Sequence, residues 1–136
     1  MKSSLIDAGP IIALFDNSDQ HHQRVLQFLK NYKGRLITTL PVLTEVCYML
    51  DFNIQAQLDF LDWVIDGGVE ICQLEQWQLT GVRERMEKYS DLPADFADAT
   101  LIEAAESRNL TSIITIDRDF DVYRKSEGKP LKTLLQ

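Results

Sequence analysis

The chain has 136 residues, of which 45% are hydrophobic, and it carries a formal net charge of −7. This length and apolar content suffice for one sizeable core, so we expect a single domain over residues 1–136. The acidic balance argues against a protein that coats nucleic acid through a broad basic face. Apolar runs stop well short of the roughly 20 residues of a membrane span, and polar or helix-breaking residues interrupt the run that a signal peptide needs. A cytoplasmic protein without a membrane partner is therefore expected.

Short apolar runs alternate along the chain with apolar residues at helical spacing. We expect strands over 3–6, 36–39, 69–74 and 112–116, a fifth, edge strand over 131–135, and helices from about 10 onward and over 19–32, 41–50, 54–65, 75–89 and 91–108. Strands joined by crossover helices pair in parallel, which predicts a doubly wound α/β sheet with helices on both faces. In such sheets, binding sites lie outside the carboxyl ends of the strands, where the strand order reverses.

Five carboxylates stand where an α/β protein would rarely place charge without a function. They are Asp7, Glu45, Asp95, Asp98 and Asp117. Asp7 and Asp117 each end a short strand-like run, and the other three lie on or beside apolar helix faces. Carboxylates that converge repel one another unless a cation neutralises them, and magnesium and manganese prefer oxygen ligands. The pattern therefore predicts a site for a hard divalent cation.

Asp98 breaks the pattern of its expected helix most clearly. Its helical neighbours Leu101, Ile102 and Ala105 form an apolar stripe, whereas Glu103, Glu106 and Ser107 form the expected solvent side. Asp95 lies three positions earlier on the same face. An alternative interpretation is that both acids interact favourably with the helix N-terminus, which suits Asp95 better than Asp98.

The remaining three acids each have an alternative interpretation. Glu45 lies at the border of the apolar stripe of its helix, and could be a solvated residue in an early turn. Asp7 could be the N-cap of the following helix, and Asp117 allows the same interpretation, with Asp119 as a second candidate cap. Together with Asp98, these acids come from four segments that the topology brings to one edge of the sheet.

Cysteine and histidine give no sign of a site. Cys47 and Cys72 have apolar neighbours and no zinc-type spacing, so we expect reduced core residues. His21 and His22 are adjacent, so on a helix they point about 100° apart and cannot both face one metal. We expect neither histidine to be catalytic.

Basic residues gather in two segments. These are Arg24, Lys30, Lys33 and Arg35, and then Arg118, Arg124, Lys125, Lys129 and Lys132. Either group could be an ordinary solvated face or could contact the phosphates of a nucleic acid.

Four motifs in order resemble the acidic motifs of the PIN domain, and most closely its bacterial VapC-type toxin branch. They are LIDAGPIIALFD, TTLPVLTEV, LPADFADATLIEAAE and IITIDRDFDVY, and they span nearly the whole chain. The resemblance implies a three-layer α/β/α sandwich with a mostly parallel central sheet of four to five strands. It also implies magnesium- or manganese-dependent cleavage of RNA at Asp7, Glu45, Asp98 and Asp117, with Asp95 in support. Thr115 matches a residue that often helps to hold such a site.

The chemistry expected of this site is metal-assisted phosphodiester hydrolysis. Asp7, Asp98 and Asp117 would hold the principal magnesium ion directly or through water, and Glu45 and Asp95 would complete that site or a second one. No histidine, cysteine or serine nucleophile is needed. Single-stranded RNA is the expected substrate, because a flexible strand can present its phosphate to an acidic cleft.

The resemblance also implies partners. Toxin-branch members are commonly held inactive by a small antitoxin protein that inserts a segment into the acidic cleft, and many form homodimers. Trp63, Trp77 and Phe52 are candidates for a self-interface, although we expect them in the core.

Two other function classes remain open. A PIN-like binding or scaffolding module would not need its carboxylates intact. A phosphoacceptor signalling domain would need a lysine at the end of a late strand, where the segment TIDRDF places Asp117.

Overall fold

In the described part of the chain, five strands form a single sheet in which every pair of neighbours is parallel. The computed structural model describes residues 2–92, 95–124 and 128–135, without the side chains of Arg118 and Asp119. The strands are β1 (Lys2–Ile6), β2 (Gly34–Thr38), β3 (Glu70–Ile71), β4 (Ser112–Ile114) and β5 (Lys132–Thr133). Their order is β3-β2-β1-β4-β5, so β5 is an edge strand as predicted.

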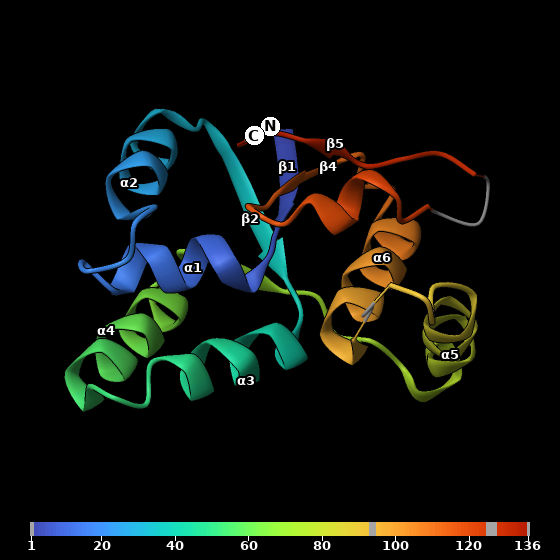
Figure 1. Cartoon of the computed structure of the whole chain (residues 1–136), viewed down its shortest axis with the longest axis horizontal. Coiled ribbons are helices and arrows are strands. Elements are labelled where there is room, and N and C mark those ends of the chain that lie inside the picture. Colours follow the sequence, from blue (N-terminus) through green and yellow to red (C-terminus); the bar gives the residue numbers. More distant parts are fainter. Residues whose placement is uncertain (1, 93–94, 125–127, 136) are drawn as a thin grey trace.

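Helices flank this sheet on both sides. They are α1 (Ala8–Phe15), α2 (His22–Asn31), α3 (Leu40–Met49), α4 (Ile54–Ile65), α5 (Leu79–Lys88) and α6 (Phe96–Arg108), with short 3₁₀ turns η1 (Gln76–Gln78) and η2 (Arg118–Asp121). Figure 1 shows α1 and α2 on one side of the strands and α5 and α6 on the other. The predicted α/β/α fold with a parallel sheet is therefore confirmed. None of the described helices is long and apolar enough to cross a membrane.

Several element boundaries differ from those predicted. The strand expected over 69–74 is shortened to the two residues of β3, because the chain leaves the sheet after Cys72 donates its backbone N–H to the Thr38 carbonyl. The helix expected over 75–89 is divided into η1 and α5. The last helix begins at Phe96 rather than near 91, and Pro93, which was expected to introduce it, lies outside the described residues.

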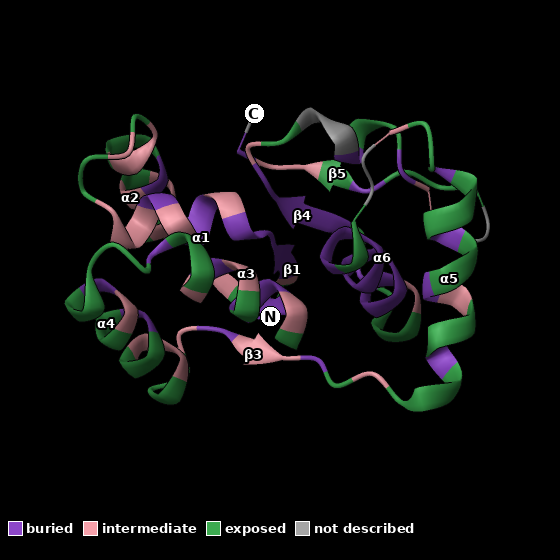
Figure 2. Ribbon diagram, turned by 60° about the horizontal axis from the view of Figure 1, so that its bottom comes forward, coloured by how far each residue is buried: buried purple, intermediate pink, exposed green. Residues whose placement is uncertain are grey.

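The core is built around β1, β4 and α6. Leu5, Ile6, Ile113 and Ile114 have no exposed surface. Figure 2 shows α6 as buried along most of its length. The helix therefore has no wide solvent face, because other elements cover it on more than one side.

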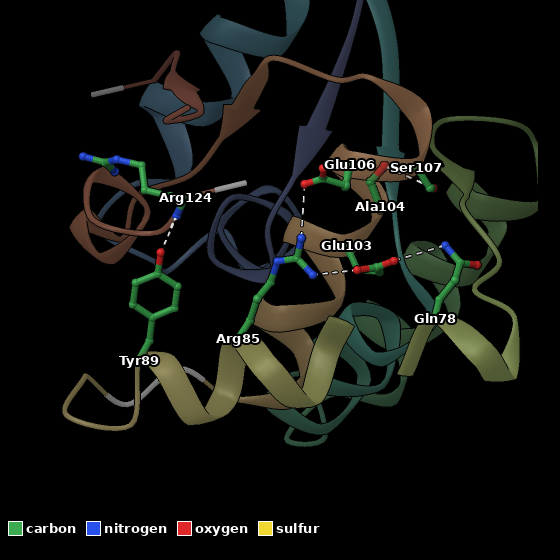
Figure 3. A network of polar contacts seen from close by, with 8 residues as sticks. All are labelled: Gln78, Arg85, Tyr89, Glu103, Ala104, Glu106, Ser107 and Arg124. Carbon is green, nitrogen blue, oxygen red and sulfur yellow. Dashed lines mark hydrogen bonds and ion pairs between the residues drawn. The ribbon is translucent and has the colours of Figure 1, made fainter. Parts of the chain in front are cut away.

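The expectation that Glu103 faces solvent is wrong. The Glu103 side chain is buried, and its Oε1 atom lies 2.6 Å from a guanidinium nitrogen of Arg85 on α5. Arg85 also contacts Glu106 at 3.2 Å (Figure 3). The sequence pattern gave the polar side of α6 correctly, but α5 packs against that side and supplies the opposite charge.

The large aromatic candidates for a self-interface behave differently from one another. Trp63 is half-buried, and its ring centroid lies 5.5 Å from that of Phe15. Trp77 and Phe52 are 74% and 64% exposed, so the expectation that they belong to the core is wrong. Both lie in short connections outside the longer helices. Cys72 is buried and Cys47 half-buried, and both are free thiols as predicted.

Candidate active site

The carboxyl ends of β1 and β4 form the point where the strand order reverses. The chain adds β2 and β3 on one side of β1 and then returns to add β4 on the other side. Asp7 directly follows β1, and its backbone N–H donates to the Ile114 carbonyl of β4 at 3.0 Å. Asp117 comes three residues after β4. The topology thus brings two acids that are 110 positions apart in the sequence to the place where such sheets bind ligands.

Thr115 connects these two acids. Its hydroxyl donates to Asp7 Oδ2 at 3.1 Å, and the Asp117 backbone N–H donates to the same hydroxyl oxygen at 3.0 Å. The other carboxylate oxygen of Asp7 accepts a hydrogen bond from the Ala8 backbone N–H at 2.7 Å, so Asp7 is also the N-cap of α1. The orientation of the Asp7 carboxylate is therefore fixed by a hydrogen bond to each oxygen, and each oxygen keeps a further lone pair for a ligand.

Asp95 and Asp98 lie at the N-terminus of α6. Asp95 is the N-cap, and its carboxylate accepts the Asp98 backbone N–H at 2.8 Å. Asp98 is only 8% exposed. Thr100 in the same turn contacts the Thr39 hydroxyl at 2.8 Å and so ties α6 to the end of β2. The capping interpretation is therefore correct for Asp95, whereas Asp98 is a buried acid without that role.

All five predicted acids line one cleft of about 470 Å³. Glu45 reaches it from α3. The described lining residues are Asp7, Ala8, Gly9, Ile12, Asp19, His21, Glu45, Met49, Asp95, Asp98, Ile116 and Asp117. Asp19 was not among the predicted site residues, and His21 was not expected to be catalytic. Both lie before α2, which begins at His22 rather than at 19 as predicted, so the helical spacing expected over 19–32 did not give the direction of either side chain.

Neither of the two basic segments contributes a described residue to this lining. Lys125 and the side chain of Arg118 lie outside the described residues. Among the described lining residues, every ionisable side chain except that of His21 is therefore a carboxylic acid.

Burial and mutual repulsion raise the pKa of the innermost acids. The pKa of Asp7 is raised to about 7, chiefly by burial and to a lesser degree by Glu45 and Asp117, against the opposing hydrogen bonds from Ala8 and Thr115. The pKa of Asp98 rises to about 8, chiefly through burial and then through repulsion by the other four acids. Burial, followed by repulsion from Asp95 and Asp117, also raises the pKa of Glu45. Ionising all of them together requires a compensating positive charge.

A family model for the PIN domain matches residues 4–126. The chain belongs to the PIN domain family. Among characterised proteins, it is 23% identical over 116 residues to ribonuclease VapC26 of Mycobacterium tuberculosis, an alignment that covers 84% of this chain and 86% of that protein. The predicted resemblance to the PIN domain is confirmed, with VapC toxin ribonucleases as distant relatives.

Solved structures agree with this PIN fold. VapC20 of Mycobacterium tuberculosis, a toxin that cleaves the sarcin-ricin loop, superposes with a TM-score of 0.79 at 16% identity over 87% of this chain and 92% of that one. VapBC2 of Rickettsia felis, bound to a DNA fragment of its promoter, gives 0.62 at 15% identity over 88% and 92%. A toxin–antitoxin complex from Klebsiella pneumoniae gives 0.61 at 18% identity over 85% and 87%. At these identities the likeness shows the fold.

PIN domains generally bind divalent metals, and the donor set of this cleft fits that property. Five convergent carboxylates offer the hard oxygen ligands that magnesium and manganese prefer. In the described part of the chain, no three Asp, Glu, His or Cys side chains already form a group that could hold an ion. Magnesium usually keeps several water ligands and takes only one or two carboxylates. Carboxylates that lie too far apart to ligate one ion all together can therefore still hold an ion that is partly bound by water.

Proposed function

We propose that this PIN domain is a magnesium- or manganese-dependent endoribonuclease that hydrolyses phosphodiester bonds of single-stranded RNA, as the toxin of a toxin–antitoxin pair. The observation that carries the proposal is the convergence of five carboxylates, two of them buried, on one cleft at the carboxyl edge of the sheet. The similarity to the ribonuclease VapC26 and to VapC20, a toxin that cleaves the sarcin-ricin loop, supports the substrate class.

Three acids would hold the catalytic ion. Asp7, Asp98 and Asp117 would ligate it directly or through water, and Glu45 and Asp95 would complete this site or a second one. When bound, a divalent ion supplies a hydroxide at neutral pH and neutralises charge that develops on the phosphate and on the leaving oxygen. This division of labour needs no side-chain nucleophile.

The protein's own contribution is to place the carboxylates and to keep them ionisable. Thr115 fixes the orientation of Asp7 and the backbone of Asp117 with one hydroxyl. A positive charge in the cleft lowers the pKa of acids beside it, which opposes the upward shifts at Asp7 and Asp98. Metal binding and ionisation of the cleft would therefore favour each other.

The partner of this toxin would be a small antitoxin protein. Two structural relatives were crystallised as toxin–antitoxin assemblies. A segment that carries basic side chains would complement the acids of the cleft.

We also propose a homodimer, supported by an exposed apolar stripe on α4. The stripe consists of Ile54, Leu58, Leu61 and Ile65, at 66%, 46%, 39% and 78% exposure.

Removing one buried carboxylate tests the nuclease proposal. Asp98→Asn should lower the rate of cleavage of labelled single-stranded RNA by at least about a hundredfold, beyond the 10- to 100-fold typical of groups that only support metal ligands. The variant should remain folded, because the amide has the same size and the change removes a charge that burial disfavours. Gel assays with manganese, magnesium or chelator provide the measurement, and circular dichroism checks the fold.

The matched control is Asp62→Asn, the same chemical change at an exposed position of α4. It should leave cleavage unchanged. RNA cleavage that persists in chelator, or that survives Asp98→Asn, contradicts the proposal.

A further inference from the structure

The two adjacent histidines of this chain occupy different environments. His22 is held in the structure, because its Nδ1 atom lies 2.7 Å from the Ala13 carbonyl oxygen of α1. His21 lines the acidic cleft and is half-buried. Among the described residues, no group forms a hydrogen bond with the ring of His21. One histidine thus pins α2 to α1, and the other presents a ring with unused hydrogen-bonding capacity to the cleft.

The backbone of His21 is fixed although its ring has no partner. Its N–H donates to the Asp19 carboxylate at 2.8 Å, and its carbonyl accepts the Val25 N–H at 3.0 Å. His21 is also the N-cap residue of α2, where it makes no side-chain capping bond. The ring is therefore held at the cleft by its backbone and does not serve the helix that it precedes.

The ring of His21 differs in hydrogen-bonding capacity from the other side chains that line the cleft. The described lining residues are six with carboxylic acid side chains, four with apolar side chains, one glycine, and His21. Ionised carboxylates only accept hydrogen bonds, and so do the oxygens of a phosphodiester. Among the described lining residues, His21 is therefore the only one whose side chain donates a hydrogen bond irrespective of the protonation of the acids.

We propose that His21 is a substrate-contacting residue that donates a hydrogen bond from its ring to a phosphate oxygen of the bound RNA. This inference rests on the proposed function. It accounts for how an acidic cleft, whose described lining residues include no lysine or arginine, contacts an anionic strand by means other than the metal. A hydrogen bond to a charged group contributes more than one between neutral groups.

Variants that differ in donor capacity test this contact. His21→Leu removes the donor and should lower kcat/KM for single-stranded RNA by about 10- to 100-fold, the loss expected for one hydrogen bond to a charged group. The loss should appear mainly as a raised KM, because the contact is made with bound substrate. His21→Gln keeps a donor and should retain most of the activity. His22→Gln is the control: it should lower the melting temperature and leave kcat/KM unchanged.

A spectroscopic measurement separates contact from structural support. The chain contains two histidines, so a ¹H–¹³C spectrum has two sets of imidazole signals, and His22→Gln assigns them. Uridine 5′-monophosphate, added with magnesium, supplies a phosphate without a phosphodiester to cut. It should shift the His21 signals and leave those of His22 in place.

The outcomes distinguish this inference from the proposed function. If the wild type cuts RNA and His21→Leu cuts equally well, the inference is wrong and the nuclease proposal stands. If the wild type cuts no RNA, the nuclease proposal fails, and the response of the His21 signals to the nucleotide still decides whether the ring contacts phosphate. If magnesium alone shifts the His21 signals as far, and His21→Leu abolishes stabilisation by magnesium, His21 is a metal ligand and the proposed contact is overturned.

Discussion

Helix α6 contributes acids to two charged regions, one in which an arginine pairs with the acids and one in which acids lie beside other acids. Asp98 in its first turn faces other carboxylates in the acidic cleft. Glu103 and Glu106, further along the same helix, meet Arg85 of α5 at 2.6 and 3.2 Å (Figure 3). Asp98 and Glu103 are equally buried, at 8% exposure. Burial alone therefore does not distinguish a candidate functional acid from a structural one; the partners do.

The region around Glu103, Glu106 and Arg85, called the structural region below, receives its compensating charge from the protein itself. Arg85 is 7% exposed, and the Gln78 amide donates to the second oxygen of Glu103 at 3.4 Å. Gly81 lets α5 approach closely, since a Cβ at this position would collide with Glu103 and crowd Arg85. Mixed charges also line the adjacent cleft of about 660 Å³. Here the desolvation cost of each charge is offset by an opposite charge from the same protein.

Among the described residues that line the acidic cleft, no lysine or arginine offsets the buried acids Asp7 and Asp98. Asp7 and Asp98 reduce the cost of burial by holding protons to higher pH, as their raised pKa values indicate. A buried charge that the protein leaves uncompensated indicates a ligand, whereas a compensated one indicates packing. This distinction can be tested by measuring how each region responds to a lost charge, to pH and to metal.

The largest effect on stability should come from breaking the structural region. Arg85→Met leaves Glu103 buried without its cation and should lower the free energy of unfolding by about 3–5 kcal/mol. Arg83→Met, two residues away, breaks an exposed pair with Glu87 that spans 3.9 Å, and should cost less than about 0.5 kcal/mol. Urea unfolding measures both. Equal losses for the two variants would remove the contrast between the regions.

The next largest effect should be a dependence on pH in chelator. Asp7 and Asp98 have raised pKa values, so between about pH 4 and 8 the folded protein binds more protons than the unfolded chain. This contribution is fully present below the ordinary Asp pKa of 3.8 and is lost as the pH rises through about 7 and 8. We expect the free energy of unfolding to fall by about 3 kcal/mol between pH 6 and pH 7.5.

Asp98→Asn provides the control for this pH dependence. With one titrating acid removed, the curve should flatten, and at pH 8 in chelator the variant should melt at a higher temperature than the wild type. A wild-type protein that becomes more stable on going from pH 5 to pH 8 would show that the cleft acids are ionised at little cost.

The smallest effect should be stabilisation by metal. Magnesium at ten times its dissociation constant should stabilise the fold by about 1.4 kcal/mol at pH 7.5, and manganese should act in the same direction. Differential scanning fluorimetry measures the shift, and Asp98→Asn should reduce it. Unchanged melting temperatures with both ions would undermine the metal site, while the contrast in pH dependence would stand on its own.

The sequence predicted the elements well because their apolar periodicity is strong. The central strands, α3, α4 and the end of α6 near Arg108 agree with the structure to within one or two residues. The failures occurred where tertiary partners decide the outcome. Glu103 was assigned to solvent because the pattern of one helix contains no information about α5. Trp77 and Phe52 were assigned to the core because hydrophobicity does not show which connections remain uncovered.

The candidate site was predicted to a similar degree. Asp98 was singled out from its own helix, and Asp7 and Asp117 from the ends of strand-like runs; all now lie at one cleft, and their roles stay a prediction. His21 was set aside on the assumption that it lies on a helix with His22; it precedes that helix, and its position depends on the backbone bonds to Asp19 and Val25.

By itself, the sequence determined the order of strands and helices along the chain, the family, and the presence of five carboxylates at strand ends and on apolar helix faces. Those properties follow from local periodicity and charge, which each segment carries with it. Only the tertiary structure decided which acids are compensated. Compensation depends on what packs within a few ångströms, and in this protein the partners of Glu103 and of Asp98 come from segments far apart along the chain.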